Sequence, residues 1–402
     1  MSGTLILASG RWDNNIAVID VEAALDPAND ATDRAVLSRP RVTPDVQGAP
    51  ASGQPVSVLV PKSGSQAYVV NHSGVVPASA AGGYQHGHPG TVTVLDLATL
   101  RDPRADGTTA AIAGIIETGT FGPVGSAITP DGAHLLVGAA EAAGAEDGGV
   151  EITAIDRATR QVVRRIRMRD AGGEPCYHDS PHADFGRFPD PNGIAVSALG
   201  TGWLLTANGG TDDVSIIDLA RAMAGEEDAE VARIPVQSGG FGISVSPDQC
   251  VAAVASRESM RTGAYGNTVS LIDIAERRET ARIQVGTDDA AEGTRPFVAA
   301  FTPDGSHLVV TCFASDTVSL VHVASGREVK RLALVDPSGG PARPRGAAIS
   351  ADGAWAAITG GKKTGPGSSV LWMIDLRTFT VTSRVTGIGN ETYLLDILPA
   401  GS

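Results

Sequence analysis

Five of the eight histidines in this 402-residue chain fall within two unusually long polar segments. They are His72, His86 and His88 in the segment 71–90, and His178 and His182 in the segment 170–193. Neutral imidazole is a common ligand of Zn, Cu, Fe and Ni, and histidine also serves as an acid or base near neutral pH. Long connections without secondary structure of their own are usually functional or disordered. The clustering therefore marks these two segments as the first candidate for chemistry.

Three interpretations of the five histidines stay open. They hold a metal through at least three rings, they act as metal-free acid–base or ligand-binding groups, or they are ordinary polar loop residues. The first interpretation predicts a divalent transition metal, with Zn, Mn or Ni favoured over Cu, bound by His72, His86, His88, His178 and His182. Candidate catalytic groups are His178, His182, Tyr177 and Tyr84. His134, His307 and His322 fall at strand or turn positions of a repeat, where we expect structural roles.

A second set of residues is cationic, although the formal net charge is -14. Arginine binds carboxylate or phosphate through a two-pronged fork. We expect Arg257, Arg295 and Arg345 to bind substrate, with Trp12 and Tyr265 beside them. The alternative is that these arginines brace loops through ion pairs with Glu258, Glu391 and neighbouring acids, and the sequence weighs the two about evenly.

The elements that must position these residues are repeats. One signature is a strand, a Pro-Asp-Gly-like turn and another strand; examples are AITPDGAHLLV from Ala127 and AFTPDGSHLVV from Ala300. The other is a strand that closes on an aspartate: Asp20, Asp96, Asp156, Asp218, Asp273 and Asp375, with His322 in the equivalent place. Seven such units recur at roughly 50 to 75 residues. Helical periodicity is absent except for one predicted turn near 219–225.

Short strands rich in Val, Ile and Thr, repeated seven times, predict an all-β seven-bladed β-propeller as a single domain. The amino- and carboxyl-terminal segments each supply part of one unit, so we expect their strands to share a blade and close the ring. The predicted blades are 392–402 with 1–44, then 52–120, 122–169, 189–237, 238–286, 294–335 and 342–387. In a propeller the connections between blades and between the two middle strands lie on one face, which gathers both histidine segments and the arginines there.

The Pro-Asp-Gly turns and the VSLIDI-type strands resemble the YVTN-type propeller repeats and their lactonase-like relatives, over nearly the whole chain. The resemblance implies the propeller fold and is compatible with lactone hydrolysis. It is equally compatible with lyase chemistry, because related propeller lyases use a histidine-lined, metal-containing mouth. A fold of this kind hosts many activities, so the fold alone does not select one.

Composition excludes several classes of function. The acidic balance, with a net charge of -14, argues against nucleic acid as a partner. No apolar run approaches the about 20 residues that a membrane helix needs. The chain begins in a predicted strand without signal-peptide features, which predicts a cytoplasmic location. No nucleotide fingerprint or serine elbow is present, so no nucleotide cofactor is expected.

These observations together predict an enzyme for a small-molecule substrate: a metal-dependent hydrolase of the lactone or ester type, acting on an anionic or polar compound. The alternatives are a metal-dependent lyase that abstracts a proton alpha to a carbonyl, a non-catalytic binding or scaffold propeller, and a copper redox protein. The sequence does not determine the oligomeric state.

Overall fold

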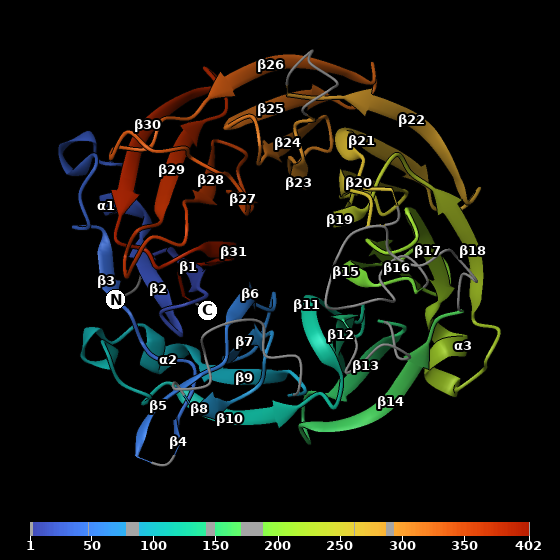
Figure 1. The fold of residues 1–402 in the computed structure, drawn as a ribbon, viewed down its shortest axis with the longest axis horizontal. Helices are drawn as coiled ribbons and strands as arrows, with labels where there is room; N and C mark the ends of the chain where they lie inside the picture. The colour runs from blue at the N-terminus through green and yellow to red at the C-terminus, as the bar shows by residue number, and fades with distance from the viewer. Residues whose placement is uncertain are drawn as a thin grey trace. The chain divides into compact units, whose positions relative to one another are not determined.

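The structure is a computed structural model that describes residues 3–46, 48–77, 88–141, 149–169, 188–260, 262–286 and 293–401. Its strands form seven four-stranded antiparallel sheets, the blades of an all-β propeller, as the repeats predicted. The chain divides into two compact units, unit 1 comprising Met1–Gly119 with Leu332–Ser402 and unit 2 comprising Thr120–Arg331. Within each unit, the strands of a blade follow one another outward from the innermost strand (Figure 1).

Unit 1 holds three complete blades, described here from the innermost strand outward. Blade 1 consists of β31 (Thr392–Leu398), β1 (Leu5–Gly10), β2 (Asn15–Asp20) and β3 (Val36–Ser38). Blade 2 consists of β6 (Pro55–Leu59), β7 (Gln66–Asn71), β9 (Thr91–Asp96) and β10 (Ile112–Glu117). Blade 7 consists of β27 (Ala347–Ile349), β28 (Trp355–Gly360), β29 (Val370–Asp375) and β30 (Thr380–Thr386).

Unit 2 holds blades 3, 4 and 5, together with blade 6 up to Arg331. Blade 3 consists of β11 (Phe121–Ile128), β12 (His134–Glu141), β13 (Glu151–Asp156) and β14 (Gln161–Arg167). Blade 4 consists of β15 (Pro191–Ser197), β16 (Trp203–Asn208), β17 (Asp213–Asp218) and β18 (Glu230–Pro235). Blade 5 consists of β19 (Gly240–Val245), β20 (Val251–Glu258), β21 (Tyr265–Asp273) and β22 (Arg278–Gln284). Blade 6 consists of β23 (Pro296–Phe301), β24 (His307–Cys312), β25 (Thr317–His322) and β26 (Arg327–Ala333).

Blade 1 joins the two ends of the chain, as predicted. Strand β31 pairs with β1 in antiparallel register from Leu5 opposite Leu398 to Gly10 opposite Thr392. Main-chain hydrogen bonds therefore link segments almost 400 residues apart in sequence, and they cover the inner edge of β1.

The aspartates that end the third strand of six blades have one structural task. Each side chain accepts a hydrogen bond from the backbone N–H three residues later, at 2.7 to 3.1 Å. In three blades this bond caps a short helix: α1 (Val21–Leu25), α2 (Leu97–Leu100) and α3 (Leu219–Ala224). The sequence predicted only the third helix; α1 and α2 were missed because four or five residues are too few to show a helical period. Two 3-10 turns, η1 (Pro27–Asn29) and η3 (Pro103–Ala105), follow α1 and α2.

The core lies between neighbouring blades of a unit. In unit 1, Leu7 and Val18 of blade 1 pack with Val69 of blade 2, all with no exposed surface. In unit 2, Ala253 and Val269 of blade 5 pack with Val310 of blade 6 in the same way. Full burial of such a side chain contributes about 1.5 to 3 kcal/mol, so each blade is held chiefly by its neighbours.

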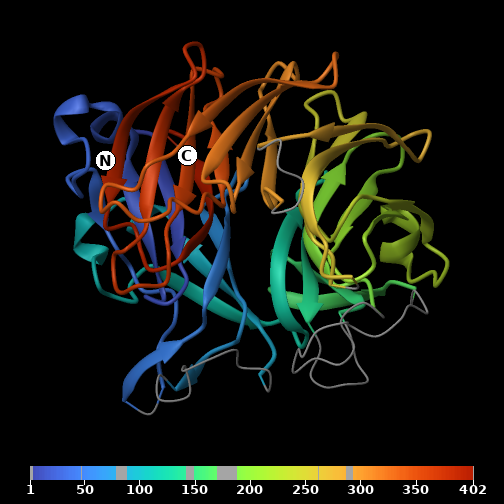
Figure 2. The same cartoon turned by 45° about the horizontal axis from the view of Figure 1, so that its top comes forward.

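Unit 1 carries one addition to the propeller pattern. Strands β4 (Asp45–Val46), β5 (Ala49–Ser52) and β8 (Val76–Pro77) form a small separate sheet. Its β4–β5 hairpin extends away from the blades of unit 1 (Figure 2). Among the described residues, no helix is long and apolar enough to span a bilayer.

Candidate functional site

The same backbone strain recurs where the chain approaches the innermost strand of a blade. Five non-glycine residues at this point have left-handed backbone angles with φ between 47° and 56°: Gln54, Asp190, Arg295, Arg343 and Glu391. Four of them precede a proline, a context that disfavours helical backbone angles. Such conformations cost about 1 to 3 kcal/mol each and often occur at functional sites. All five residues are polar or charged, so the repeated turn places polar side chains at this end of five blades.

In unit 1 the arginine of this region is fully paired. The Arg345 side chain is only 5% exposed, and its Nη2 donates to Glu391 Oε1 at 3.0 Å. Its Nη1 donates to the Gly361 carbonyl at 2.5 Å. Glu391 also accepts a 2.6 Å hydrogen bond from the indole N–H of Trp12. Arg345 and Trp12, both predicted to bind substrate, are therefore committed to the same carboxylate.

Arg11 extends this unit 1 cluster. Its guanidinium donates to the Tyr393 hydroxyl at 2.9 Å and to Gln54 Oε1 at 3.1 and 3.3 Å. The Lys363 ammonium lies 3.2 Å from the centroid of the Trp12 ring, where it is favoured by a cation–π interaction. Each polar group of this cluster thus has an internal partner, which is the arrangement of a structural brace.

Unit 2 holds an arginine in a contrasting environment. Arg257, at the end of β20, places its guanidinium carbon 5.2 Å from the Phe241 ring centroid, 5.4 Å from Phe297 and 6.0 Å from Phe313. The Phe241 and Phe297 rings are themselves 4.2 Å apart. Among the described residues no acceptor lies within hydrogen-bond distance of the Arg257 guanidinium, and its Nε is buried. A cation that packs on apolar rings without an acceptor can bind an anion.

Arg295 lies in the same region of unit 2. Its guanidinium carbon is 3.6 Å from the centroid of the Tyr265 ring, and its Nη1 is 3.6 Å from Glu258 Oε2. That separation is long for an ion pair, and both partners retain about a fifth of their side-chain exposure, 23% and 21%. The Arg295 Nε is buried and has no acceptor among the described residues. Arg295 is therefore only partly neutralised, so it can assist Arg257.

The structure describes only some of the histidines that were predicted to form the site. His72 is buried directly after β7, where its backbone N–H donates to the Gln54 carbonyl at 3.0 Å. His88 is exposed and lines a cavity of about 300 Å³ with Pro89 and Glu117. A Cβ on Gly74 would lie 3.9 Å from the Cβ of His88, so His72 and His88 belong to one region of blade 2. The other predicted ligands and catalytic groups lie outside the described residues: His86, His178, His182, Tyr84 and Tyr177.

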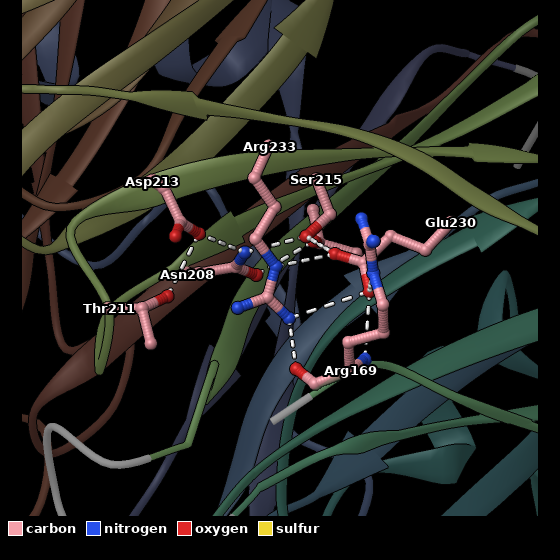
Figure 3. A network of polar contacts seen from close by, with 8 residues as sticks. Arg169, Asn208, Thr211, Asp213, Ser215, Glu230 and Arg233 are labelled. Atoms are coloured by element: carbon pink, nitrogen blue, oxygen red, sulfur yellow. Dashed lines mark hydrogen bonds and ion pairs between the residues drawn. The ribbon is translucent and has the colours of Figure 1, made fainter. Parts of the chain in front are cut away.

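A buried polar network fixes the point at which the chain leaves blade 3 toward His178. The Glu230 carboxylate, with a side chain only 2% exposed, accepts from Arg233 Nε at 2.6 Å, from the Arg169 backbone N–H at 2.8 Å and from Ser215 Oγ at 2.8 Å (Figure 3). Burial favours the protonated acid, but these hydrogen bonds outweigh it and lower the pKa of Glu230. Arg233 also donates to the Arg169 carbonyl. The ionised carboxylate thus holds the last described residue before the second histidine segment.

The network continues along the end of blade 4. Asn208 Nδ2 donates to Ser215 Oγ at 2.9 Å and to Asp213 Oδ1 at 2.6 Å (Figure 3). Burial raises the pKa of Asp213, while hydrogen bonds from Asn208 and Thr211 oppose that rise. On the other side of the segment, Asp190 Oδ1 accepts from the Gly149 backbone N–H at 2.9 Å. Both described ends of the segment with His178 and His182 are therefore anchored by buried hydrogen bonds.

Over the described part of the chain, no three His, Cys, Asp or Glu side chains converge in a way that could hold a metal ion. The metal prediction rests mainly on His86, His178 and His182, which lie outside that part. It stays a prediction.

The sequence predicted that Arg257 binds substrate but gave no sign of Phe297 and Phe313 beside it. The chain has only eight phenylalanines, and three of them meet Arg257. Phe297 reads as an ordinary residue of an apolar strand, and Phe313 follows one. The available signal was the concentration of a rare residue type at corresponding ends of blades 5 and 6.

No protein-family model matches the sequence, and no curated protein does. Solved structures do resemble the chain. The periplasmic gluconolactonase of Pseudomonas aeruginosa is 15% identical with a TM-score of 0.68, and the match covers 99% of each chain. A candidate 6-phosphogluconolactonase of Bacteroides fragilis is 14% identical with a TM-score of 0.64, covering 99% of this chain and 98% of that chain.

A third similar structure has an unrelated activity. The hydrazine synthase of Kuenenia stuttgartiensis is 20% identical with a TM-score of 0.56, covering 83% of this chain and 80% of that chain. At such identities the likeness shows the fold, a seven-bladed β-propeller. Because the same architecture serves different chemistries, function must be argued from the residues of the site.

Proposed function

We propose that this protein is a hydrolase of the lactone or ester type that binds an anionic small-molecule substrate through Arg257. The observation that carries the proposal is the Arg257 guanidinium, which rests on Phe241, Phe297 and Phe313 without an acceptor among the described residues. Whole-length similarity of fold to a gluconolactonase and to a candidate 6-phosphogluconolactonase supports a lactone as the reacting group.

The three phenylalanines determine what Arg257 can do. They exclude water from one side of the guanidinium, so a carboxylate or phosphate on the open side is attracted more strongly than it would be in bulk solvent. Arg295, held at 3.6 Å over the Tyr265 ring, lies in the same region and offers a second cation. A substrate fixed by its anionic group loses translational freedom before reaction, which places its carbonyl for attack.

Hydrolysis also needs an activated water molecule. Water attacks the lactone carbonyl carbon, the ring C–O bond breaks, and the ring oxygen leaves as a hydroxyl group after taking a proton. We propose that His178 and His182, which belong to the same unit of the chain as Arg257, provide the base and acid, either directly or through a bound divalent transition metal.

A second function, elimination, is favoured by one observation. Tyr265 is 41% exposed and lies beneath Arg295, so its hydroxyl group can reach a substrate that the arginine holds by a carboxylate. A tyrosine in this position suits abstraction of a proton alpha to that carboxylate. The products separate the two reactions: hydrolysis releases a hydroxy acid, whereas elimination creates a conjugated double bond that absorbs in the ultraviolet.

The test is a hydrolysis assay on a neutral aldonolactone and on its phosphorylated or carboxylated counterparts. We expect kcat/KM to be higher for the anionic lactones and Arg257→Met to reduce it for these alone. Arg278→Gln is the matched control, because Arg278 is an exposed arginine of the same blade paired with Glu276. Equal turnover of neutral and anionic lactones by the wild type and by Arg257→Met would refute the role of Arg257. Failure to hydrolyse any lactone would refute the hydrolase.

A further inference from the structure

Blade 6 departs from the other blades at one cross-strand pair. Where the second and third strands meet at the turn end, six blades place an aspartate on the third strand, and blade 3 pairs His134 with Asp156 in this way. In blade 6 the pair is His307 with His322. In blade 6 a second imidazole, directly opposite the first, therefore occupies the position of the capping aspartate in the other blades.

The strand register brings the two side chains close together. The Val323 N–H donates to the Ser306 carbonyl at 2.9 Å, so the adjacent pair, His307 with His322, is the non-hydrogen-bonded kind. Side chains approach each other most closely in such pairs. The two ring centroids are 5.1 Å apart, with a 53° angle between the ring planes. Both residues are partly exposed, so an ion can reach them from solvent.

Hydrogen bonds select the same tautomer for each ring. Ser306 donates its hydroxyl proton to Asp304 Oδ2 at 2.7 Å, so its oxygen accepts from His307 Nδ1–H at 2.8 Å. Ser325 directs its proton to the His322 carbonyl at 3.3 Å, so its oxygen accepts from His322 Nδ1–H at 2.9 Å. Both Nε2 atoms therefore keep a free lone pair. A histidine ligand oriented by a hydrogen bond from its other nitrogen is the usual arrangement at metal sites.

Neutral imidazoles are required for this role. Burial is the largest effect on His307 and lowers its pKa; His322 and Lys330 lower it further, and Asp304 opposes the shift. The shift favours the neutral form of the His307 ring.

We propose that His307 and His322 form a chelating site for a divalent transition ion, bound through the two Nε2 atoms and completed by water. Imidazole suits Cu²⁺, Ni²⁺ and Zn²⁺, and Cu²⁺ binds most tightly in the general order of affinities. The ion links β24 to β25 at the end of blade 6 opposite Phe313, so it stabilises the blade and takes no part in catalysis. The site is independent of the proposed hydrolase activity.

The site is tested by metal binding to the full chain without an affinity tag, stripped of metal and then titrated with Ni²⁺ or Cu²⁺ by calorimetry. We expect His307→Asn and His322→Asn each to lose one binding equivalent or to weaken it on the order of tenfold or more. His134→Asn, the same repeat position in blade 3, is the matched control and should bind as the wild type does. Asparagine at 322 can supply the turn cap that aspartate provides elsewhere, so His322→Asn should fold.

Two further measurements distinguish chelation by His307 and His322 from metal binding elsewhere on the chain. Electron paramagnetic resonance of the Cu²⁺ complex should show coupling to two equivalent nitrogens, which His322→Asn reduces to one. Ser306→Ala should keep the stoichiometry and weaken affinity by about tenfold, because the His307 ring loses its orienting partner. Unchanged binding and spectra in His307→Asn and His322→Asn, or an equal loss in His134→Asn, would overturn the proposal.

Discussion

Two arginine clusters lie at the same end of their blades but differ in how many hydrogen-bond acceptors the protein provides for them. In unit 1, Arg345 has Glu391 and the Gly361 carbonyl as acceptors. In unit 2, Arg257 has three phenylalanine faces and no acceptor among the described residues. A partly buried charge without a counter-charge costs free energy, and Arg257 is partly buried. The difference supports the proposal that a ligand completes the second cluster, whereas the first is a brace.

The largest effect should follow from breaking the brace. Replacing Arg345 with Met leaves Glu391 and the Gly361 carbonyl short of a donor in a region where Arg345 was only 5% exposed. We expect the free energy of unfolding to fall by about 3 to 5 kcal/mol, as measured by guanidinium denaturation. Glu391→Gln keeps an acceptor for Trp12 and should cost less. If Arg345→Met lost less unfolding free energy than Glu391→Gln, Arg345 would not be the brace described above.

The buried carboxylates of the two units should respond oppositely to pH. Asp396 of β31 accepts two backbone hydrogen bonds, from Val60 and Ile397, but burial outweighs them and raises its pKa to about 6 from an ordinary value of 3.8. Folded Asp396 therefore keeps its proton longer than the unfolded chain does. Its contribution is fully present below the unfolded pKa and is lost as pH rises to about 6, about 3 kcal/mol in all.

Glu230 has the opposite sign, because its lowered pKa makes the folded state release its proton first. Its contribution is present above the unfolded pKa and is lost as pH falls through the folded one. The free energy of unfolding should be measured from pH 3 to 7. In the wild type, Asp396 makes it fall as the pH rises toward 6, and Asp396→Asn should remove this fall. Glu230 makes it rise as the pH increases from acid values, and Glu230→Gln should remove this rise. Identical pH profiles for both variants and the wild type would contradict the assigned environments.

Replacing an arginine with methionine in unit 2 should affect ligand binding without lowering the free energy of unfolding. Arg257→Met keeps contact with the three phenylalanines and removes a guanidinium that has no acceptor. We expect the affinity for an anionic substrate or product to fall about 10- to 100-fold, or about 1.4 to 2.8 kcal/mol. Unfolding free energy should stay constant or rise by up to about 1 kcal/mol. Loss of stability as large as in Arg345→Met would remove the contrast between the two clusters.

The smallest effect concerns Glu258. Its 3.6 Å pair with Arg295 is partly exposed, so it contributes less than about 1 kcal/mol to stability. Glu258→Gln removes the competing carboxylate and should raise anion affinity about two- to fivefold, measured by the same titration. Asp248→Asn, on an exposed turn at the other end of blade 5, is the control. Weaker anion binding in Glu258→Gln would show that Arg295 depends on its glutamate for orientation.

Much of the fold could be predicted because it repeats. The Pro-Asp-Gly turns and the strand-closing aspartates recur in register, so the blades and the shared terminal blade followed from pattern alone. Helices α1 and α2 did not, because their four or five residues are stabilised by an aspartate cap and by packing rather than by a period of their own. Arg257 and Arg345 were both predicted to bind substrate, and no spacing rule could have separated them.

The sequence by itself determined the architecture and the end of each blade at which polar chemistry gathers, because strand period and turn residues are local properties that repeat. It also marked His322 as the exception to six aspartates. Only the tertiary structure decided which cations are neutralised: Arg345 meets Glu391 from 46 residues away, whereas Arg257 meets phenylalanines from two blades. Whether a charge finds a partner depends on distances of about 3 Å between groups remote in sequence, and such distances are set by how blades pack rather than by any local pattern.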